Sequence, residues 1–167
     1  MLKKIILLLN ILFIATLAHA QSYDTTPPYL KNKQLPDFIL YSKDSVAFDQ
    51  SVLKPGRKTI IMLFNPECEH CQDQLTLLIS MPEIKQNVQL LLTTTETLEK
   101  LNIFYKKFNL QNWAFIYPGK DTKYIFGKFF QPKTIPVLAF YDSKRQFVQL
   151  SQGSMSRKQL QKVLGKM

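Results

Sequence analysis

The chain has 167 residues, of which 22 are Lys or Arg, 12 are Asp or Glu and only two are Cys, and its formal net charge is +10. This length argues against a scaffold that needs disulfide staples, because such scaffolds are usually shorter than roughly 70–80 residues. The basic residues are scattered and form no like-charge block or basic–aromatic repeat. This pattern favours a solvated basic surface, so no nucleic-acid partner is expected.

The first twenty residues have the pattern of a secretory signal peptide. Lys3 and Lys4 precede an apolar stretch at residues 5–17, and Ala18-His19-Ala20 is a small-x-small cleavage site. The stretch is shorter than the ~20 residues that span a bilayer, although an uncleaved anchor stays open as the alternative. We therefore predict a signal peptide at 1–20, a polar linker at 21–34 and one domain at 35–167. Cleavage near Ala20 would leave a periplasmic or secreted protein.

The pattern of apolar residues predicts the helices and strands of the domain. Two short strands at 38–41 and 46–48 flank turn-forming residues and predict a hairpin. After the hairpin, the spacing of apolar residues predicts these elements in chain order: strand 59–64, helix 71–80, strand 88–94, helix 96–108, strand 113–117, helix 122–130, strands 135–141 and 147–150, and helix 156–164. Pro118-Gly119 is expected to end the strand before it.

Alternation of strands and helices through the middle of the chain predicts parallel strand pairing with helices on both faces. The run at 59–64 is nearly all apolar, as in a strand that is covered on both sides. The last two strands are adjacent in sequence and should pair antiparallel. The expected fold class is α/β, with a mixed central sheet flanked by helices and an N-terminal β-hairpin extension.

The two cysteines are separated by Glu69 and His70, between a predicted buried strand and a predicted helix. A disulfide closing so short a loop gains only about 2 kcal/mol, so a purely structural bond is disfavoured. A closed zinc site needs three or four ligands. Cys68, Cys71 and His70 offer three at most, and adjacent residues share one ion poorly, so no metal is expected. The remaining interpretation is a redox-active pair.

A redox role has a physical mechanism at this position. Unsatisfied backbone N–H groups and the helix dipole stabilise a thiolate at a helix N-terminus. Cys68, the first and usually more exposed thiol, would attack a substrate disulfide. Cys71, one turn further in, would then attack the mixed disulfide and release the substrate.

The segment from Phe64 to Cys71, together with residues 134–137 before a later strand, resembles the thioredoxin superfamily. Residues 35–38 and the hairpin resemble more specifically the exported TlpA/ResA-like redoxins. The resemblance implies a thioredoxin fold from about Leu35 onward and a cis peptide bond before Pro136. It also implies a substrate groove formed by Pro136, Ile135 and Pro66, with Ile135 offering backbone hydrogen bonds.

The sequence departs from the family at the groups that tune the thiols. Glu67 replaces an aromatic residue before Cys68, and the strand before the motif has Met62 where thioredoxins carry a buried acid. Gln74 stands where ResA-like relatives place a glutamate, which leaves water or Asp73 to accept the proton of Cys71. His70 should stabilise the Cys68 thiolate, whereas Glu67 and Glu69 should disfavour it. We expect a reduction potential between about −270 and about −120 mV.

The predicted function is thiol–disulfide exchange with extracytoplasmic protein thiols and disulfides, without a cofactor, by a monomer. An upstream redox partner, expected in the membrane, would regenerate the Cys68–Cys71 pair. Two alternatives stay open. One is a non-catalytic binding module with a static disulfide. The other is a peroxiredoxin-type peroxidase, which is disfavoured because Asn65 occupies the position of that family's threonine or serine.

Overall fold

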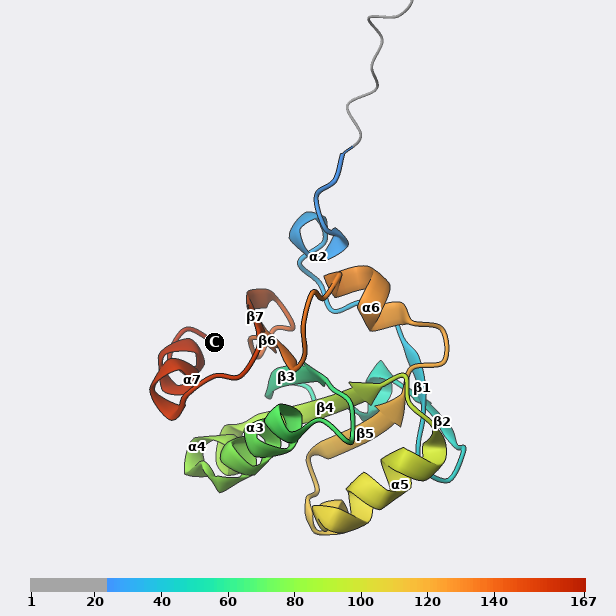
Figure 1. Cartoon of the computed structure of the whole chain (residues 1–167). Helices are drawn as coiled ribbons and strands as arrows, with labels where there is room; N and C mark the ends of the chain where they lie inside the picture. Colours follow the sequence, from blue (N-terminus) through green and yellow to red (C-terminus); the bar gives the residue numbers. More distant parts are fainter. Residues whose placement is uncertain (1–23) are drawn as a thin grey trace, which may run out of the picture.

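The computed structural model describes residues 24–167, so the predicted signal peptide and its cleavage site lie outside the described residues (Figure 1). Seven strands form one sheet in the order β2-β1-β5-β4-β3-β6-β7. Their bounds are β1 (Ile39–Tyr41), β2 (Ala47–Asp49), β3 (Lys58–Leu63), β4 (Val88–Thr94), β5 (Ile116–Lys120), β6 (Val137–Tyr141) and β7 (Phe147–Gln152).

The sheet is mixed, as predicted. Strands β3, β4 and β5 are parallel, and β6 and β7 add antiparallel pairing on the β3 side. On the other side, β1 and β2 form the predicted N-terminal hairpin, and β1 pairs antiparallel with β5. The carboxyl ends of the three parallel strands and the amino end of β6 therefore share one edge of the sheet.

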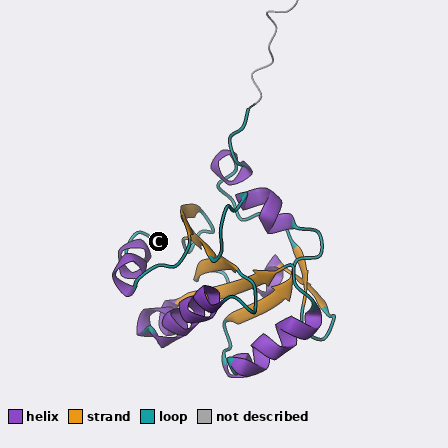
Figure 2. Ribbon diagram, in the orientation of Figure 1, coloured by secondary structure: helices purple, strands orange, loops and turns teal. Residues whose placement is uncertain are grey.

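Helices cover both faces (Figure 2). Their bounds are α2 (Pro28–Lys31), α3 (Glu69–Ser80), α4 (Pro82–Asn87), α5 (Leu98–Lys107), α6 (Ile125–Phe130) and α7 (Arg157–Leu164), with short 3-10 turns at Gln50–Val52 and Leu110–Asn112. Within residues 24–167, no helix is both long enough and apolar enough to cross a membrane. Helix α4 was not predicted; Met81 and Pro82 interrupt the helical run and start a new helix.

Two hydrophobic cores lie on the two sides of the sheet. On β3, Ile60 and Met62 contribute to the core beneath α3, α5 and α7, whereas Ile61 and Leu63 contribute to the core beneath α6. This division follows from the two-residue side-chain period of a strand. Strands β3 and β4 are almost entirely buried, which confirms that this part of the sheet is covered on both faces.

The N-terminal segment packs on the domain. Part of the predicted linker forms α2, and the ring of Tyr29 lies 5.9 Å from that of Phe130 and 5.2 Å from that of Phe147. The hairpin lies close to β5, because a Cβ added at Gly119 would come within 2.6 Å of the Phe48 ring and 2.8 Å of the Leu40 Cβ. Glycine at position 119 thus allows the hairpin to approach the sheet.

The largest boundary errors fall on two predicted elements. Strand β5 begins at Ile116 and continues through Pro118 and Gly119 to Lys120. Proline is tolerated there because β5 pairs with β1 at a single position, so a missing N–H is compatible with this weakly paired side. Helix α6 begins at Ile125 rather than near Thr122, because Tyr124 adopts a left-handed conformation with φ 55°.

Candidate active site

The two cysteines lie where β3 gives way to α3. Cys68 is the N-cap residue of α3 and is partly exposed, whereas Cys71 is fully buried one turn later. Both are free thiols. The backbone N–H of Cys71 donates to the carbonyl of Cys68 at 3.0 Å, which closes the first turn. This arrangement gives the exposed first thiol and buried second thiol that the sequence predicts.

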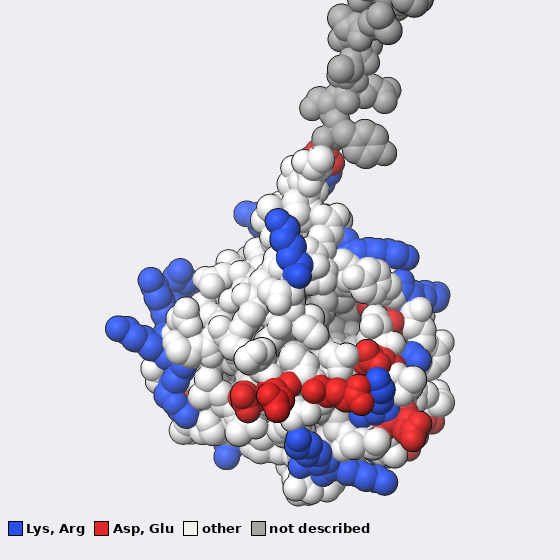
Figure 3. Space-filling model, viewed as in Figure 1, with Lys and Arg blue, Asp and Glu red and all other residues white. Residues whose placement is uncertain are grey.

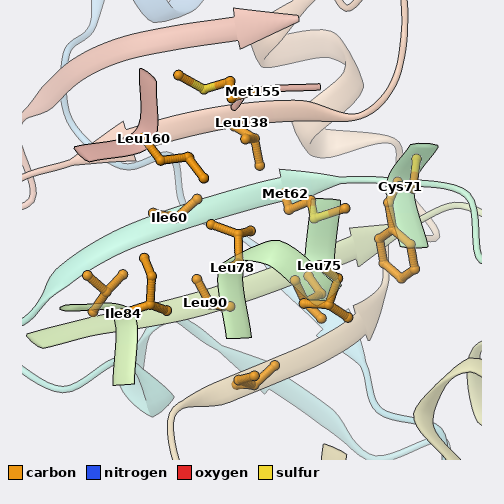
Figure 4. Packing of buried hydrophobic residues seen from close by; sticks show 14 of the residues in the cluster. Ile60, Met62, Cys71, Leu75, Leu78, Ile84, Leu90, Leu138, Met155 and Leu160 are labelled. Carbon is orange, nitrogen blue, oxygen red and sulfur yellow. The ribbon is translucent and has the colours of Figure 1, made fainter. Parts of the chain in front are cut away.

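Burial changes the acidity of the second thiol. The pKa of the Cys71 thiol is raised to about 12, first by desolvation and then by the neighbouring Cys68 thiol, while a backbone hydrogen bond from Asn65 opposes the shift. Figure 4 shows Cys71 on α3 at the margin of the apolar cluster that contains Met62 and Leu75. In the dithiol form, Cys71 therefore keeps its proton at neutral pH.

The segment before β6 lies beside residues 64–68, which join β3 to α3 and are called the cysteine loop below. Leu63, the last residue of β3, pairs with Val137, the first residue of β6, so the residues that follow β3 lie opposite those that precede β6. The Ile135–Pro136 peptide bond is cis, as the resemblance implies. Pro136 is buried and its carbonyl accepts from Gly153 N at 2.8 Å. Ile135 is 36% exposed, so it is accessible at the surface.

The other predicted site residues differ in exposure. Pro66 is buried, and its carbonyl accepts from Gln72 Nε2 at 2.7 Å, so this carbonyl already has a partner within the protein. Glu67, Glu69 and His70 are all exposed around the start of α3. Their positions beside Cys68 allow the electrostatic tuning that the sequence suggests, and that role stays a prediction.

A polar network that the sequence did not reveal surrounds Glu67. Lys100 Nζ lies 2.7 Å from Glu67 Oε2 and 3.1 Å from Glu96 Oε2. Asn65 Nδ2 donates to Glu96 Oε1 at 2.8 Å, and Asn65 Oδ1 accepts from the Glu67 N–H at 2.8 Å. The two carboxylates raise the pKa of Lys100 by hydrogen bonding to its ammonium group. Lys100 thus partly neutralises one of the two acids that flank Cys68.

Neither Asp73 nor Gln74 offers a base beside the Cys71 thiol. Asp73 is exposed and follows Cys71 by two residues, about 200° around the helix, so it faces away from the buried thiol. Gln74 lies on the same side as Cys71 and is only 2% exposed. Its Oε1 accepts from Met155 N at 2.6 Å, while its Nε2 has no partner within residues 24–167. An amide cannot act as a base, so Gln74 does not replace the glutamate that ResA-like relatives place there.

Metal binding has no support in the described part of the chain, where no group of three or more His, Cys, Asp or Glu side chains could hold an ion.

Solved structures resemble the chain over most of its length. A secreted disulfide oxidoreductase of Mycobacterium tuberculosis, homologous to E. coli DsbE, has a TM-score of 0.63 at 18% identity, covering 78% of this chain and 96% of that chain. A thiol-disulfide isomerase of Corynebacterium glutamicum has a TM-score of 0.64 at 16% identity, covering 81% and 96%. StoA of Bacillus subtilis has a TM-score of 0.57 at 18% identity, covering 79% and 98%.

The chain has a thioredoxin fold. No protein-family model and no curated protein matches the sequence. In this thioredoxin fold, β3, the cysteine loop and α3 form the strand–turn–helix that the sequence predicts, and cis-Pro136 lies across from it at the start of β6. The fold-class prediction is therefore confirmed, including the N-terminal hairpin.

Proposed function

We propose that the chain is an extracytoplasmic thiol-disulfide oxidoreductase that exchanges disulfides with protein substrates. The observation that carries the proposal is the pairing of a partly exposed Cys68 with a fully buried Cys71 one helical turn away, next to the segment of Ile135 and Pro136. The thioredoxin fold of solved structures described as a disulfide oxidoreductase and a thiol-disulfide isomerase supports it.

The reaction needs only the two thiols. The Cys68 thiolate attacks one sulfur of a substrate disulfide, forms a mixed disulfide and displaces the other substrate sulfur as a thiolate. Cys71 loses its proton to water and attacks Cys68 Sγ. This step forms the Cys68–Cys71 disulfide and releases the second substrate thiolate, so two electrons pass from the protein to the substrate. The reverse sequence oxidises a substrate dithiol.

Formation of the mixed disulfide helps the second step. The Cys68 thiol is one of the groups that raise the pKa of Cys71, after burial itself. Once Cys68 is bonded to the substrate it no longer holds a proton or a charge that opposes the Cys71 thiolate. The barrier that burial imposes on Cys71 remains, and it makes resolution the slower of the two steps.

The proposed setting follows from the signal-peptide pattern at residues 1–20 and the linker at 21–34. An exported protein of this kind needs a redox partner that regenerates its cysteines, and we propose that this partner is membrane-bound. The domain at 35–167 would act as a monomer and without a cofactor.

A trapping experiment tests the proposal. The Cys71→Ser variant, expressed in its own compartment, should accumulate mixed disulfides through Cys68 that dissolve on reduction, because the resolving thiol is gone. The matched Cys68→Ser/Cys71→Ser variant should trap nothing. If neither variant yields mixed disulfides, the result would instead support a binding module without exchange activity.

A further inference from the structure

A cavity of about 210 Å³ lies at the same sheet edge as the cysteines, but on the α6 face. Its walls come from the ends of β3, β4 and β5, from α6 and from the segment before Pro136; they include Asn65, Thr93, Glu96, Asp121, Tyr124 and Ile135. A cavity of 150 Å³ can hold a benzene molecule, so this one has room for the end of a long side chain.

Two residues of the lining carry a buried polar atom without a partner within the described residues: Asp121 through Oδ1 and Thr93 through Oγ1. Asp121 is 4% exposed and Thr93 is 2% exposed. Thr93 pairs with Gly119, two residues before Asp121, so both side chains extend from the same face of the sheet. The second oxygen of Asp121, Oδ2, accepts from Phe126 N at 2.9 Å. A buried polar atom without a partner destabilises the folded protein, so a bound donor that reaches it would relieve that cost.

The cavity is acidic although the protein is basic. Its lining contains the two carboxylates of Glu96 and Asp121 and no Lys, Arg or His. Figure 3 shows acidic side chains in a row across this view, over the region where α3 and α5 begin, with basic side chains mostly at the margins. Glu67, Glu69 and Glu99 are the exposed acids nearest in sequence to these helix starts. Glu96 already pairs with Lys100 at 3.1 Å and accepts from Asn65, so Asp121 Oδ1 is the carboxylate oxygen of the lining that has no partner within the described residues. The charge of Asp121 is complementary to a cation.

An aromatic side chain completes the lining. Tyr124 is 49% exposed, and its ring lies so close to Gly127 that a Cβ added at Gly127 would clash with it. A cation held against the face of a tyrosine ring is attracted by the negative charge density of that face. Carboxylates behind an aromatic wall are a suitable environment for a lysine or arginine side chain.

We propose that this cavity is a subsite for a lysine or arginine side chain of the substrate polypeptide, close in sequence to its reacting cysteine. The inference rests on the proposed function, since it assigns a substrate class to the same site. Ile135 links the two features, because it lines the cavity and lies beside the cysteine loop. A chain that passes Ile135 to reach Cys68 therefore crosses the mouth of the cavity.

Matched peptides provide the test. Each peptide carries one cysteine as a mixed disulfide with thionitrobenzoate. The peptides form pairs that differ at one position, which is lysine in one peptide and glutamine in the other, and this position is moved through the three residues on either side of the cysteine. Cys68 attacks the peptide sulfur, thionitrobenzoate leaves as a coloured thiolate, and Cys71 then releases the peptide thiol and forms the disulfide. Each rate constant is divided by that of the same peptide with dithiothreitol, which removes intrinsic reactivity.

At low salt, we expect the lysine peptide to react about tenfold faster than the glutamine peptide in at least one position, a ratio that corresponds to about 1.4 kcal/mol. Glu96→Gln and Asp121→Asn should each reduce that ratio below about threefold. Glu99→Gln, which removes an exposed acid outside the lining, should leave the ratio unchanged. The asparagine at position 121 can still accept from Phe126 N, and thermal unfolding of each variant checks that it is folded.

Failure of the subsite and failure of the proposed function give different results. Equal normalised rates for the lysine and glutamine peptides at every position would overturn the subsite and leave the function intact. Release of thionitrobenzoate no faster than with Cys68→Ser would refute the function. In that case the Cys68→Ser/Cys71→Ser variant, titrated with serine-containing versions of both peptides, still tests the subsite. Tighter binding of the lysine version that is lost in Glu96→Gln supports it, and equal affinities overturn it.

Discussion

Raising the pH should destabilise the reduced protein through Cys71. In the unfolded chain this thiol ionises near its ordinary pKa of 9.0, whereas burial holds the pKa in the folded protein at about 12. Between these values the unfolded state binds fewer protons than the folded state, so the free energy of unfolding falls as the pH rises. Below pH 9 the effect vanishes.

The size of the effect follows from the two pKa values. At pH 10 the unfolded thiol is mostly ionised, and the loss is about 1.4 kcal/mol relative to pH 7. For a domain of this size, such a loss lowers the melting temperature by about 3–6 °C. Because burial is the first cause of the shift and the Cys68 thiol the second, Cys68→Ala should retain most of the effect.

The assay is urea unfolding of the reduced protein between pH 7 and pH 10, compared with the Cys71→Ala variant. That variant has a cavity and is less stable at every pH, but it lacks the titrating thiol. The quantity of interest is therefore the difference between the two pH profiles. Parallel profiles for the two proteins would refute the argument that the folded structure holds the Cys71 proton.

Three further substitutions test the packing, a helix cap and the polar network. Gly119→Ala should destabilise the protein by about 1–3 kcal/mol in denaturant unfolding, because the added Cβ overlaps the hairpin. Gly165→Ala should be close to neutral, because its added Cβ would lie 3.6 Å from the carbonyl oxygen of Gln161. Ser156→Ala should cost about 1 kcal/mol through loss of the capping box of α7, and no change in stability would contradict that role. Lys100→Gln should slow attack by Cys68 on a small disulfide up to about fivefold at low salt, since an exposed ion pair contributes only weakly, while Lys106→Gln at an exposed position of α5 should have no effect.

The sequence predicts the central part of the fold well because its signals are local. The bounds of β4 match the prediction at both ends, and β3 differs by one residue, since both are apolar runs with clear ends. Strand β5 was misplaced because Pro118-Gly119 is a local stop signal. Tertiary packing overrides it: Gly119 is needed where the hairpin approaches, and β1 scarcely pairs with β5 there.

In the candidate site too, the residues that belong to local motifs could be predicted, and those that depend on tertiary contacts could not. The cysteines and Pro136 are visible as motifs, because each is adjacent in sequence to the element that positions it. The contact between Lys100 and Glu67 is not, because it depends on how the start of α5 lies beside the cysteine loop. Asp121 gave no signal in the sequence, since a single acid after a strand is usually exposed, whereas here it is buried and accepts from Phe126 N of α6.

The contacts among Asn65, Glu67, Glu96 and Lys100 form a closed ring. Asn65 holds the backbone of Glu67 and the side chain of Glu96, and Lys100 joins the two glutamates from the other side. In a closed circuit, removal of any one link leaves every member attached through the remaining links. The loop before Cys68 is therefore joined twice to residues 96–100, once through Asn65 and Glu96 and once through Glu67 and Lys100. Replacing one of these four side chains should leave one of the two connections, whereas replacing one from each should release the loop.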